Sequence, residues 1–419
     1  MRRLLPIGIM YGGRASTALL GLLVLPLLNH HLSAPVFGVV AVVLSLQALV
    51  VMLDLGLAIT TGRDIAAAPP EAMAIRRRIV AHAERVLAVA YLAVLLLAAL
   101  AAAAAPLPIA PVPLLLLVAT LWMITWQNIQ IVALLASQGY ALATAFQFGG
   151  LLLRHLLSIA LVIWWAPTIE AFIAGQFAGA LPVLLAQRIL VLRRFAGGDG
   201  EGAPPPEHRA VNVAVIVQGI AGACALQLDK PLVSALASPD ATGPYFLATV
   251  LAMTPISFFA QPVAQYFQPK VIYAVASGHH QEARRLFARV ILAVVAAAVV
   301  PGLLIGLFAT PITAAWLSSH GSQPVVAHLL PILITGTAFG SLGLIPIMPL
   351  MAIRDYRYVA ATSTLLTLLV LTATAVLARQ NNMTGICVAY AIYHISSAVA
   401  LWCRAAIMVP GFRIPSRRA

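Results

Sequence analysis

Long apolar runs follow one another along almost the whole chain, separated by short polar segments. The runs are rich in Ala and Leu and are continuous, whereas strands of a membrane barrel alternate every second residue. The pattern therefore predicts an all-α polytopic membrane protein, because a helix of about 20 apolar residues crosses a hydrocarbon core roughly 30 Å thick. About twelve spans are expected, near residues 7–28, 36–59, 86–105, 112–136, 141–165, 168–192, 211–236, 243–268, 289–309, 325–350, 358–378 and 384–408.

Composition and charge agree with this class. The 419 residues are 62% hydrophobic and only 9% charged, which cannot cover a water-facing surface. The 25 basic residues outnumber the 12 acidic ones and fall mostly between spans on one side, which predicts that both termini are cytoplasmic. The excess of bases thus indicates orientation in a membrane, and no nucleic-acid partner is expected. Cys224, Cys387 and Cys403 lie in apolar stretches without metal-ligand spacing, so we predict packing roles and neither a metal nor another cofactor.

A polar tract rich in Gly and Pro lies at mid-chain, with six expected spans on either side. This composition predicts a flexible cytoplasmic linker at residues 193–210. The expected domains are then an N-terminal six-helix bundle at 1–192 and a C-terminal six-helix bundle at 211–419.

Similarity between the halves indicates an internal duplication. Aligning Gly38 with Gly243 superposes the segments that lead into the second and eighth spans, and it brings the basic stretch 74–85 opposite 279–289. Because each half contains an even number of spans, the two repeats should have the same orientation in the membrane.

Three short motifs resemble a known family. They are Leu32-Ser33-Ala34-Pro35-x-Phe37-Gly38, Asp54-Leu55-Gly56-Leu57, and Leu228-Asp229-Lys230-Pro231 followed by Gly243-Pro244-Tyr245. With the span number and the parallel halves, they resemble the polysaccharide flippases, of the O-antigen type, in the multidrug/oligosaccharidyl-lipid/polysaccharide exporter superfamily. The chain is short at its C-terminus for the branches with two extra helices, such as the lipid II flippases, which argues against those branches.

The resemblance implies a V-shaped central cavity between two six-helix bundles and transport by alternating access. The implied substrate is an undecaprenyl-pyrophosphate-linked oligosaccharide, an O-antigen or another repeat unit of a surface polysaccharide or lipopolysaccharide, moved across the bacterial inner membrane. Membrane lipids and the polysaccharide assembly machinery are the other implied partners, and the protein would not be an enzyme.

Two ionisable residues lie near the middle of the fifth span. Arg154 and His155 are too deep to reach water by snorkelling, and a charge at that depth is costly unless it faces a cavity or a partner. Arg154 could line the cavity and bind a phosphate, whose geometry suits its guanidinium. Alternatively, it could pair with a carboxylate such as Asp54 from another helix. Arg14 lies about two turns into the first span from the cytoplasmic side, where it could either face the cavity or snorkel to water. The resemblance places it where a pyrophosphate-binding arginine is found.

The second half contributes the remaining candidates. Asp229 and Lys230 are neighbours in the seventh span, so their side chains should diverge rather than form a mutual ion pair. Pro231 beside them marks a kink, so the two residues either line a cavity or gate, or pair with other helices. We therefore list Lys230 with Arg14, Arg154 and His155 as substrate-binding candidates.

Asp54, Asp229 and His394 are the candidates for gating or ion coupling. For His394 a hydrogen bond to a neighbouring helix is the alternative, and for Asp54 the alternative is a solvated position at the membrane boundary. Arg188 and Arg404, near helix ends, should snorkel to water.

Two other functions remain open. A cation-coupled drug or metabolite antiporter of the same superfamily should carry deep acidic residues, whereas the deepest clear charge here is Arg154. A membrane glycosyltransferase or polymerase needs a large loop with carboxylates or histidines, and the longest outside loop, 310–324, offers only His320. The sequence therefore favours a flippase with an anionic substrate over these two functions.

Overall fold

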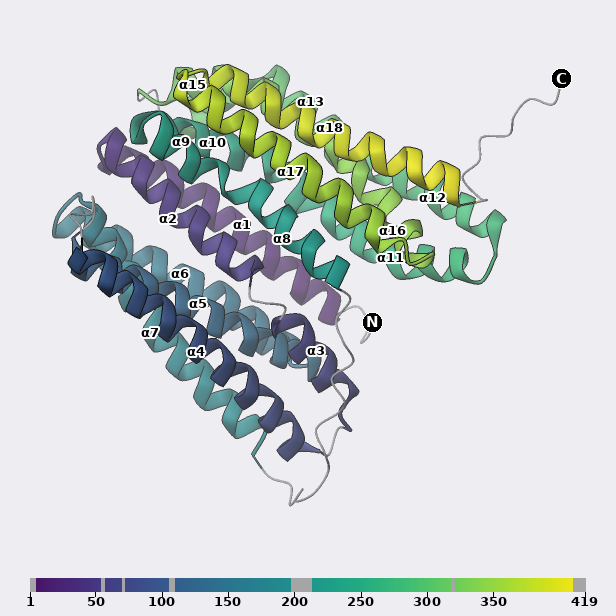
Figure 1. The fold of residues 1–419 in the computed structure, drawn as a ribbon, viewed down its shortest axis with the longest axis horizontal. Helices are drawn as coiled ribbons and strands as arrows, with labels where there is room; N and C mark the ends of the chain where they lie inside the picture. Colours follow the sequence, from purple (N-terminus) through teal and green to yellow (C-terminus); the bar gives the residue numbers. More distant parts are fainter. Residues whose placement is uncertain are drawn as a thin grey trace. The chain divides into compact units, whose positions relative to one another are not determined.

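The computed structural model describes residues 5–53, 57–69, 72–104, 110–196, 213–317 and 321–409. All regular structure in these segments is helical, which confirms the all-α class (Figure 1). The chain divides into two compact units, Met1–Val211 and Asn212–Ala419. Most of the predicted linker, residues 197–210, lies outside the described residues.

Unit 1 contains seven helices in the part of the chain described here. They are α1 (Leu5–His31), α2 (Ala34–Met52), α3 (Leu57–Ala67), α4 (Met73–Ala104), α5 (Pro111–Ala136), α6 (Tyr140–Trp164) and α7 (Ile169–Arg194). The largest interfaces join α6 to α7 and α1 to α6, and α5 packs against both α4 and α7. The expected second span, 36–59, is too long: α2 ends at Met52 and a separate short helix, α3, begins at Leu57. The α3 helix carries Thr60, Thr61, Arg63 and Asp64, a polar content that does not suit the lipid core.

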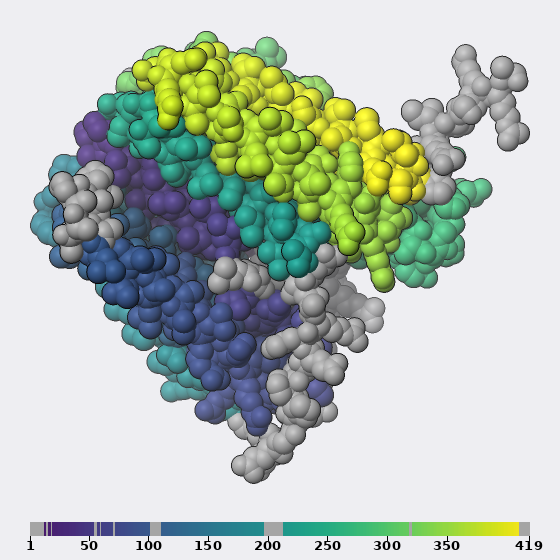
Figure 2. Space-filling view, viewed as in Figure 1, coloured from purple at the N-terminus to yellow at the C-terminus, as the bar shows by residue number. Residues whose placement is uncertain are grey.

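Unit 2 is more broken. Its helices are α8 (Val213–Gln227), α9 (Asp229–Leu236), α10 (Pro239–Pro255), α11 (Gln261–Ala276), α12 (His280–Val294), α13 (Val300–Leu307), α14 (Ala309–Leu317), α15 (Gln323–Gly340), α16 (Leu344–Ala352), α17 (Tyr356–Arg379) and α18 (Met383–Met408). In the space-filling view α17 and α18 lie along one another (Figure 2). The expected loop at 310–324 contains a helix, α14, because residues 309–317 are mostly apolar and helix-forming.

The breaks in the helices of unit 2 lie close to prolines. A π-helical turn, Ile256–Ala260, joins α10 to α11 directly after Pro255, and another, Val295–Val299, joins α12 to α13 just before Pro301. Proline cannot donate the backbone hydrogen bond of a regular helix, so the chain widens or bends near it. The α8 and α9 helices meet at an angle of 42° and together form the expected seventh span.

Ten helical segments in the described residues are long and apolar enough to cross a membrane, and the α8–α9 pair is an eleventh candidate. The first expected span corresponds to α1. Its segment Leu19–His31 is apolar but shorter than the ten spanning segments. The chain is thus a multi-pass membrane protein. The helices of two spans begin well before the expected runs, at Met73 rather than residue 86 and at His280 rather than residue 289.

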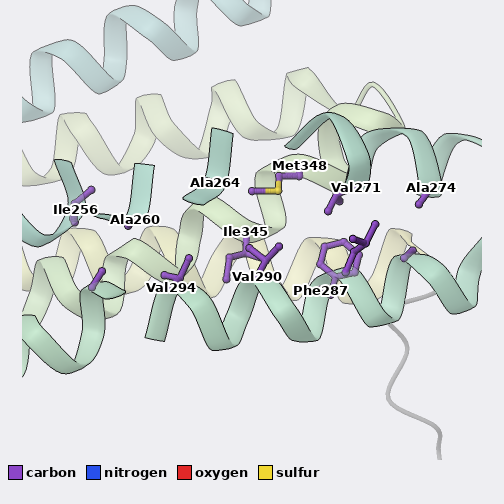
Figure 3. Packing of buried hydrophobic residues seen from close by; sticks show 13 residues of the cluster. Ile256, Ala260, Ala264, Val271, Ala274, Phe287, Val290, Val294, Ile345 and Met348 are labelled. Carbon is purple, nitrogen blue, oxygen red and sulfur yellow. The ribbon is translucent and has the colours of Figure 1, made fainter. Parts of the chain in front are cut away.

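Each unit has its own apolar core. In unit 2 one cluster joins α11, α12 and α16, where Val290 and Val294 face Ile345 and Met348 (Figure 3). In unit 1 a cluster at one end of the bundle joins the beginnings of α4 and α6 to the ends of α5 and α7. Tight turns help to set these contacts: Gln138, between α5 and α6, and Arg354, between α16 and α17, both have positive φ, 61° and 60°. Such a left-handed residue closes the end of a helix.

Candidate functional site

The site in unit 1 is built on the crossing of α6 and α7. Gly175 and Gly179 of α7 lie directly against the backbone of α6, so that a Cβ atom on Gly179 would be 2.5 Å from the Cα atom of Arg154. A Cβ atom on Gly175 would meet the backbone of Ser158. The two glycines form a small-xxx-small pattern that lets membrane helices approach closely. This contact fixes the position of the α6 backbone at Arg154.

The side chain of Arg154 is buried, with 9% of the residue exposed. Its Nε donates a hydrogen bond of 3.3 Å to the carbonyl oxygen of Gly150, one turn earlier in α6. Its Nη1 atom is buried and has no hydrogen-bond partner, and no carboxylate in the described residues lies within ion-pair distance. Buried polar groups are nearly always satisfied, so an uncompensated guanidinium here marks a site candidate.

His155 follows Arg154 and is also buried, with 5% of the residue exposed. Its Nδ1 atom has no hydrogen-bond partner in the described structure. The fifth predicted span therefore holds two adjacent basic groups with spare donor or acceptor capacity near the middle of one helix.

An uncharged polar network lies one turn from Arg154. Gln47 of α2 donates to Gln176 of α7 at 3.4 Å, and Gln176 donates to the hydroxyl of Ser158 in α6 at 2.9 Å. These amides join three helices without adding a negative charge beside Arg154. This network was not predicted, although the sequence carries a signal for it: glutamines interrupt the apolar runs of this half, and five of them are buried, namely Gln47, Gln127, Gln130, Gln176 and Gln187.

A second polar centre in unit 1 surrounds Glu84 of α4, and this centre was not predicted from the sequence either. One carboxylate oxygen accepts hydrogen bonds from Trp126 at 2.7 Å and Gln130 at 2.9 Å, and the other lies 3.5 Å from Arg188 of α7. The guanidinium of Arg188 also lies over the Trp126 ring, 5.0 Å from its centroid. Arg188, which was predicted to snorkel to water, keeps 45% of its side chain exposed and in addition has an ion-pair partner on α4. Arg404 of α18 is likewise paired, with Asp355 at 2.8 Å.

In unit 2 the structure corrects the expectation for Asp229 and Lys230. The Lys230 ammonium lies 2.9 Å from an Asp229 carboxylate oxygen, and both side chains are buried. Side chains of neighbours diverge on a straight helix, but Asp229 is the first residue of α9, directly after the 42° break from α8. The lysine turns back across this break and also donates to the carbonyl oxygen of Leu226 at 2.7 Å.

Further groups close around this ion pair. The hydroxyl of Tyr245 in α10 donates to the second Asp229 oxygen at 2.7 Å. On α18 the rings of Tyr390 and His394 are in contact, with centroids 4.7 Å apart, and Nε2 of His394 is buried without a hydrogen-bond partner. Asp229 thus joins α9 to α10, and its charge is balanced by the residue beside it.

Two candidates from the sequence cannot be placed. Asp54 lies outside the described residues, and Arg14 lies in α1 with a side chain outside the described part. Their roles stay predictions, as do the roles of the other candidates.

No family model matches the chain, and no curated protein matches it. Solved structures do match it over nearly its whole length. One is a mutant of the MATE transporter VcmN from Vibrio cholerae, with 13% identity, a TM-score of 0.64 and 96% of both chains covered. Another is a MOP superfamily transporter from Pyrococcus furiosus, with 11% identity, a TM-score of 0.68, and 98% of this chain and 95% of that one covered.

A third match is the lipid II flippase MurJ in an inward closed conformation. The identity is 12% and the TM-score 0.70, with 96% of this chain and 87% of that chain covered. The chain therefore has the fold of the MOP superfamily transporters, which the MATE transporters and MurJ also share. At these identities the likeness defines the fold, and the substrate has to be argued from the residues.

Proposed function

We propose that the protein is a flippase for a lipid-linked oligosaccharide that carries a pyrophosphate, such as an undecaprenyl-pyrophosphate-linked repeat unit of O-antigen or another surface polysaccharide. The observation that carries the proposal is the buried guanidinium of Arg154, which no described carboxylate neutralises. A pyrophosphate that enters a low-dielectric site loses its hydration and needs a fixed cation there. Arg154 supplies that cation, and its planar fork suits phosphate oxygens.

The surroundings of Arg154 fit an anionic ligand better than a cationic one. Gln176 and Ser158 in the next turn are uncharged, and His155 beside Arg154 is basic. We propose that Arg154 and His155 contact the pyrophosphate, together with Arg14 of α1. Lys230 is the weaker substrate-binding candidate, because Asp229 already occupies its ammonium.

The fold supports transport of this kind without defining the substrate. MurJ is named a lipid II flippase and the other matches include MATE transporters. In our proposal the two bundles alternate access to a central cavity in the bacterial inner membrane, with both termini cytoplasmic and no catalytic step. Outward movement of about two negative charges would gain roughly 2.3 kcal/mol per charge per 100 mV of inside-negative potential.

Substitution of Arg154 tests the proposal. In a strain that lacks the chromosomal gene, Arg154→Ala should abolish surface glycan and accumulate the lipid-linked precursor in the inner leaflet. Arg154→Lys should retain part of the export, since it keeps the charge and loses the fork. Arg193→Ala is the matched control, because it removes an exposed arginine from the last turn of α7 in the same unit, and it should export normally. Glycan display and protein abundance are measured for each variant.

The rival account makes Arg154 a structural partner of Asp54. It predicts that Arg154→Ala loses export and that the double variant Arg154→Ala/Asp54→Ala recovers it, because the orphaned carboxylate is gone. Recovery of glycan display by the double variant would reject the substrate-binding role.

A cation-coupled drug or metabolite antiporter is the second candidate, favoured by one observation. Asp229 is a deeply buried carboxylate in unit 2, with 1% of the residue exposed, and such a group could bind a coupling cation. Lys230 already supplies a positive charge 2.9 Å away, so the site would first have to release its own lysine. Uptake of a cationic dye into vesicles, driven by a proton or sodium gradient and lost in Asp229→Asn at equal amounts of folded protein, would support this function over the flippase.

A further inference from the structure

Two helices extend well beyond the thickness of a membrane at their N-terminal ends. The α4 helix has 32 residues, or roughly 48 Å at about 1.5 Å per residue, against a hydrocarbon core roughly 30 Å thick. The segment His280–Leu307, which includes α12 and α13, has 28 residues, or roughly 42 Å. In both helices the first turns are rich in arginine and the later turns are apolar, so the charged beginnings lie at headgroup level or in water.

The two beginnings match residue by residue. With a shift of two residues from the alignment of Gly38 with Gly243, the exposed pair Arg77-Arg78 of α4 aligns with the exposed pair Arg284-Arg285 of α12. The rest of the turn agrees in both chemistry and burial: buried Ile79-Val80 aligns with buried Leu286-Phe287, exposed His82 with exposed Arg289, and buried Ala83 with buried Val290. We call the exposed residues of these turns the basic collars: Arg77, Arg78 and His82 in unit 1, and Arg284, Arg285 and Arg289 in unit 2.

Each collar is held by the core of its own unit. In unit 1, Ile79 and Val80 belong to the cluster at the end of the bundle that also contains Leu134 of α5 and Val191 of α7. In unit 2, Leu286 and Phe287 pack into the cluster with Val271 of α11. The arginines therefore project from rigid, packed helices and not from loops.

The surroundings of the collar in unit 2 are typical of a membrane interface. Tyr266 and Tyr273 of α11 are exposed, 53% and 66%, and the Lys270 ammonium lies 3.6 Å from the centroid of the Tyr266 ring. Tyrosines and bases of this kind gather at the headgroup level of membranes. An open cavity of about 670 Å³ lies beside the collar, and its described lining includes Arg285, Arg289, His279 and His280. Glu282 is the carboxylate in that lining, and it is 3.8 Å from His279.

We propose that each basic collar binds the phosphate groups of anionic membrane lipids, such as phosphatidylglycerol, and so anchors the end of its bundle in one leaflet. This role is separate from the proposed transport of a lipid-linked oligosaccharide. Lipid phosphate suits the collars better than a soluble anion, because the arginines stand at the ends of apolar spans and the interfacial tyrosines lie beside them. With the orientation expected from the sequence, the leaflet is the cytoplasmic one.

Native mass spectrometry of the purified full chain in detergent tests the proposal, with phosphatidylglycerol and phosphatidylcholine as the two lipid probes. The wild-type chain should bind phosphatidylglycerol more tightly than phosphatidylcholine. Arg285→Gln/Arg289→Gln and Arg77→Gln/Arg78→Gln should each weaken the phosphatidylglycerol adducts, by about fivefold per arginine removed. Arg285→Lys/Arg289→Lys keeps the charges and should bind like the wild type, which shows that the Gln variants fail by charge and not by misfolding.

Arg379→Gln is the matched control. Arg379 is an exposed arginine in the last turn of α17. Because α17 begins at the α16–α17 turn and crosses the unit, Arg379 lies on the side of the unit opposite that turn. This control should leave the lipid selectivity unchanged. Inorganic phosphate at constant ionic strength is the competitor that separates the two sources of phosphate. Equal binding of phosphatidylglycerol by the wild type and the Gln variants would overturn the proposal, and so would displacement of the lipid by inorganic phosphate.

Discussion

Arg154 in unit 1 and Lys230 in unit 2 are both buried cations in membrane helices, yet their surroundings differ. Arg154 lies near the middle of the continuous helix α6, where its backbone is in close contact with Gly179 of α7, and it has a guanidinium nitrogen that no described group satisfies. Lys230 lies at a helix break, 2.9 Å from the carboxylate of Asp229, and it also donates to a backbone carbonyl. In the described residues, unit 1 therefore holds a buried charge without a counter-charge, and unit 2 holds a buried charge that the neighbouring residue neutralises.

This difference suggests a division of roles. A fixed, uncompensated cation stabilises a bound anion, whereas a compensated pair stabilises the bend at which it is placed. The hydroxyl of Tyr245 adds a third contact to Asp229 and joins α9 to α10. We therefore expect Arg154 to matter for transport and the Asp229–Lys230 pair to matter for the stability of unit 2.

Breaking the pair should have the largest effect on stability. Asp229→Asn leaves a buried lysine without its counter-charge, and Lys230→Met leaves a buried carboxylate, so each should destabilise the protein by about 3–5 kcal/mol. The double variant Asp229→Asn/Lys230→Met removes both charges and should recover most of that loss. Thermal unfolding of the purified protein in detergent measures all three. A double variant as unstable as the sum of the single variants would mean that the two residues act independently.

The matched substitution in unit 1, Arg154→Met, should not destabilise the protein. Arg154→Met removes a charge that has no described counter-charge, and it should leave the midpoint of thermal unfolding unchanged or higher. The same variant should not export glycan. A large drop in stability would show that Arg154 has a structural partner and would weaken the contrast between the units.

Several features of the two sites could be predicted from the sequence. The apolar runs predicted the helical class and the rough position of most spans, and depth along the fifth run singled out Arg154 and His155. The beginnings of α4 and α12 could not be predicted from apolar runs, because their first turns are charged. The Asp229–Lys230 pair was predicted wrongly because the geometry of a straight helix was applied at a break.

The polar contacts between helices were harder to predict. Glu84 is bound by Trp126 and Gln130, which are 42 and 46 positions away in sequence, and by Arg188 of a third helix. Nothing in the local sequence says that these residues meet. The glutamines of unit 1 gave a signal by their presence in apolar runs, but their partners depend on how α2, α5, α6 and α7 pack.

A smaller effect is expected at the helix crossing that positions Arg154. Gly179→Ala places a methyl group against the backbone of α6 and must push the two helices apart, at a cost of about 1–3 kcal/mol. Gly149→Ala is the matched control, because a Cβ atom there meets nothing within 4 Å and alanine is the better helix former. Thermal unfolding and glycan display should both fall for the first variant and stay unchanged for the second. Equal behaviour of the two variants would show that the close α6–α7 contact does not support the site.

The smallest effect is expected from the segment that joins the units. The α7 helix ends at Arg194 and α8 begins at Val213, and the sequence between them is rich in Gly and Pro, as in a flexible tether. Each unit encloses its own polar centre: the Arg154 and Glu84 contacts lie within unit 1, and the Asp229 contacts lie within unit 2. Replacing residues 197–202 by a Ser/Gly segment of equal length should therefore leave glycan display unchanged. The thermal unfolding of both units should also stay unchanged. Loss of display at normal protein abundance would mean that this segment has a partner of its own, and the contrast between the units would then be an incomplete account of transport.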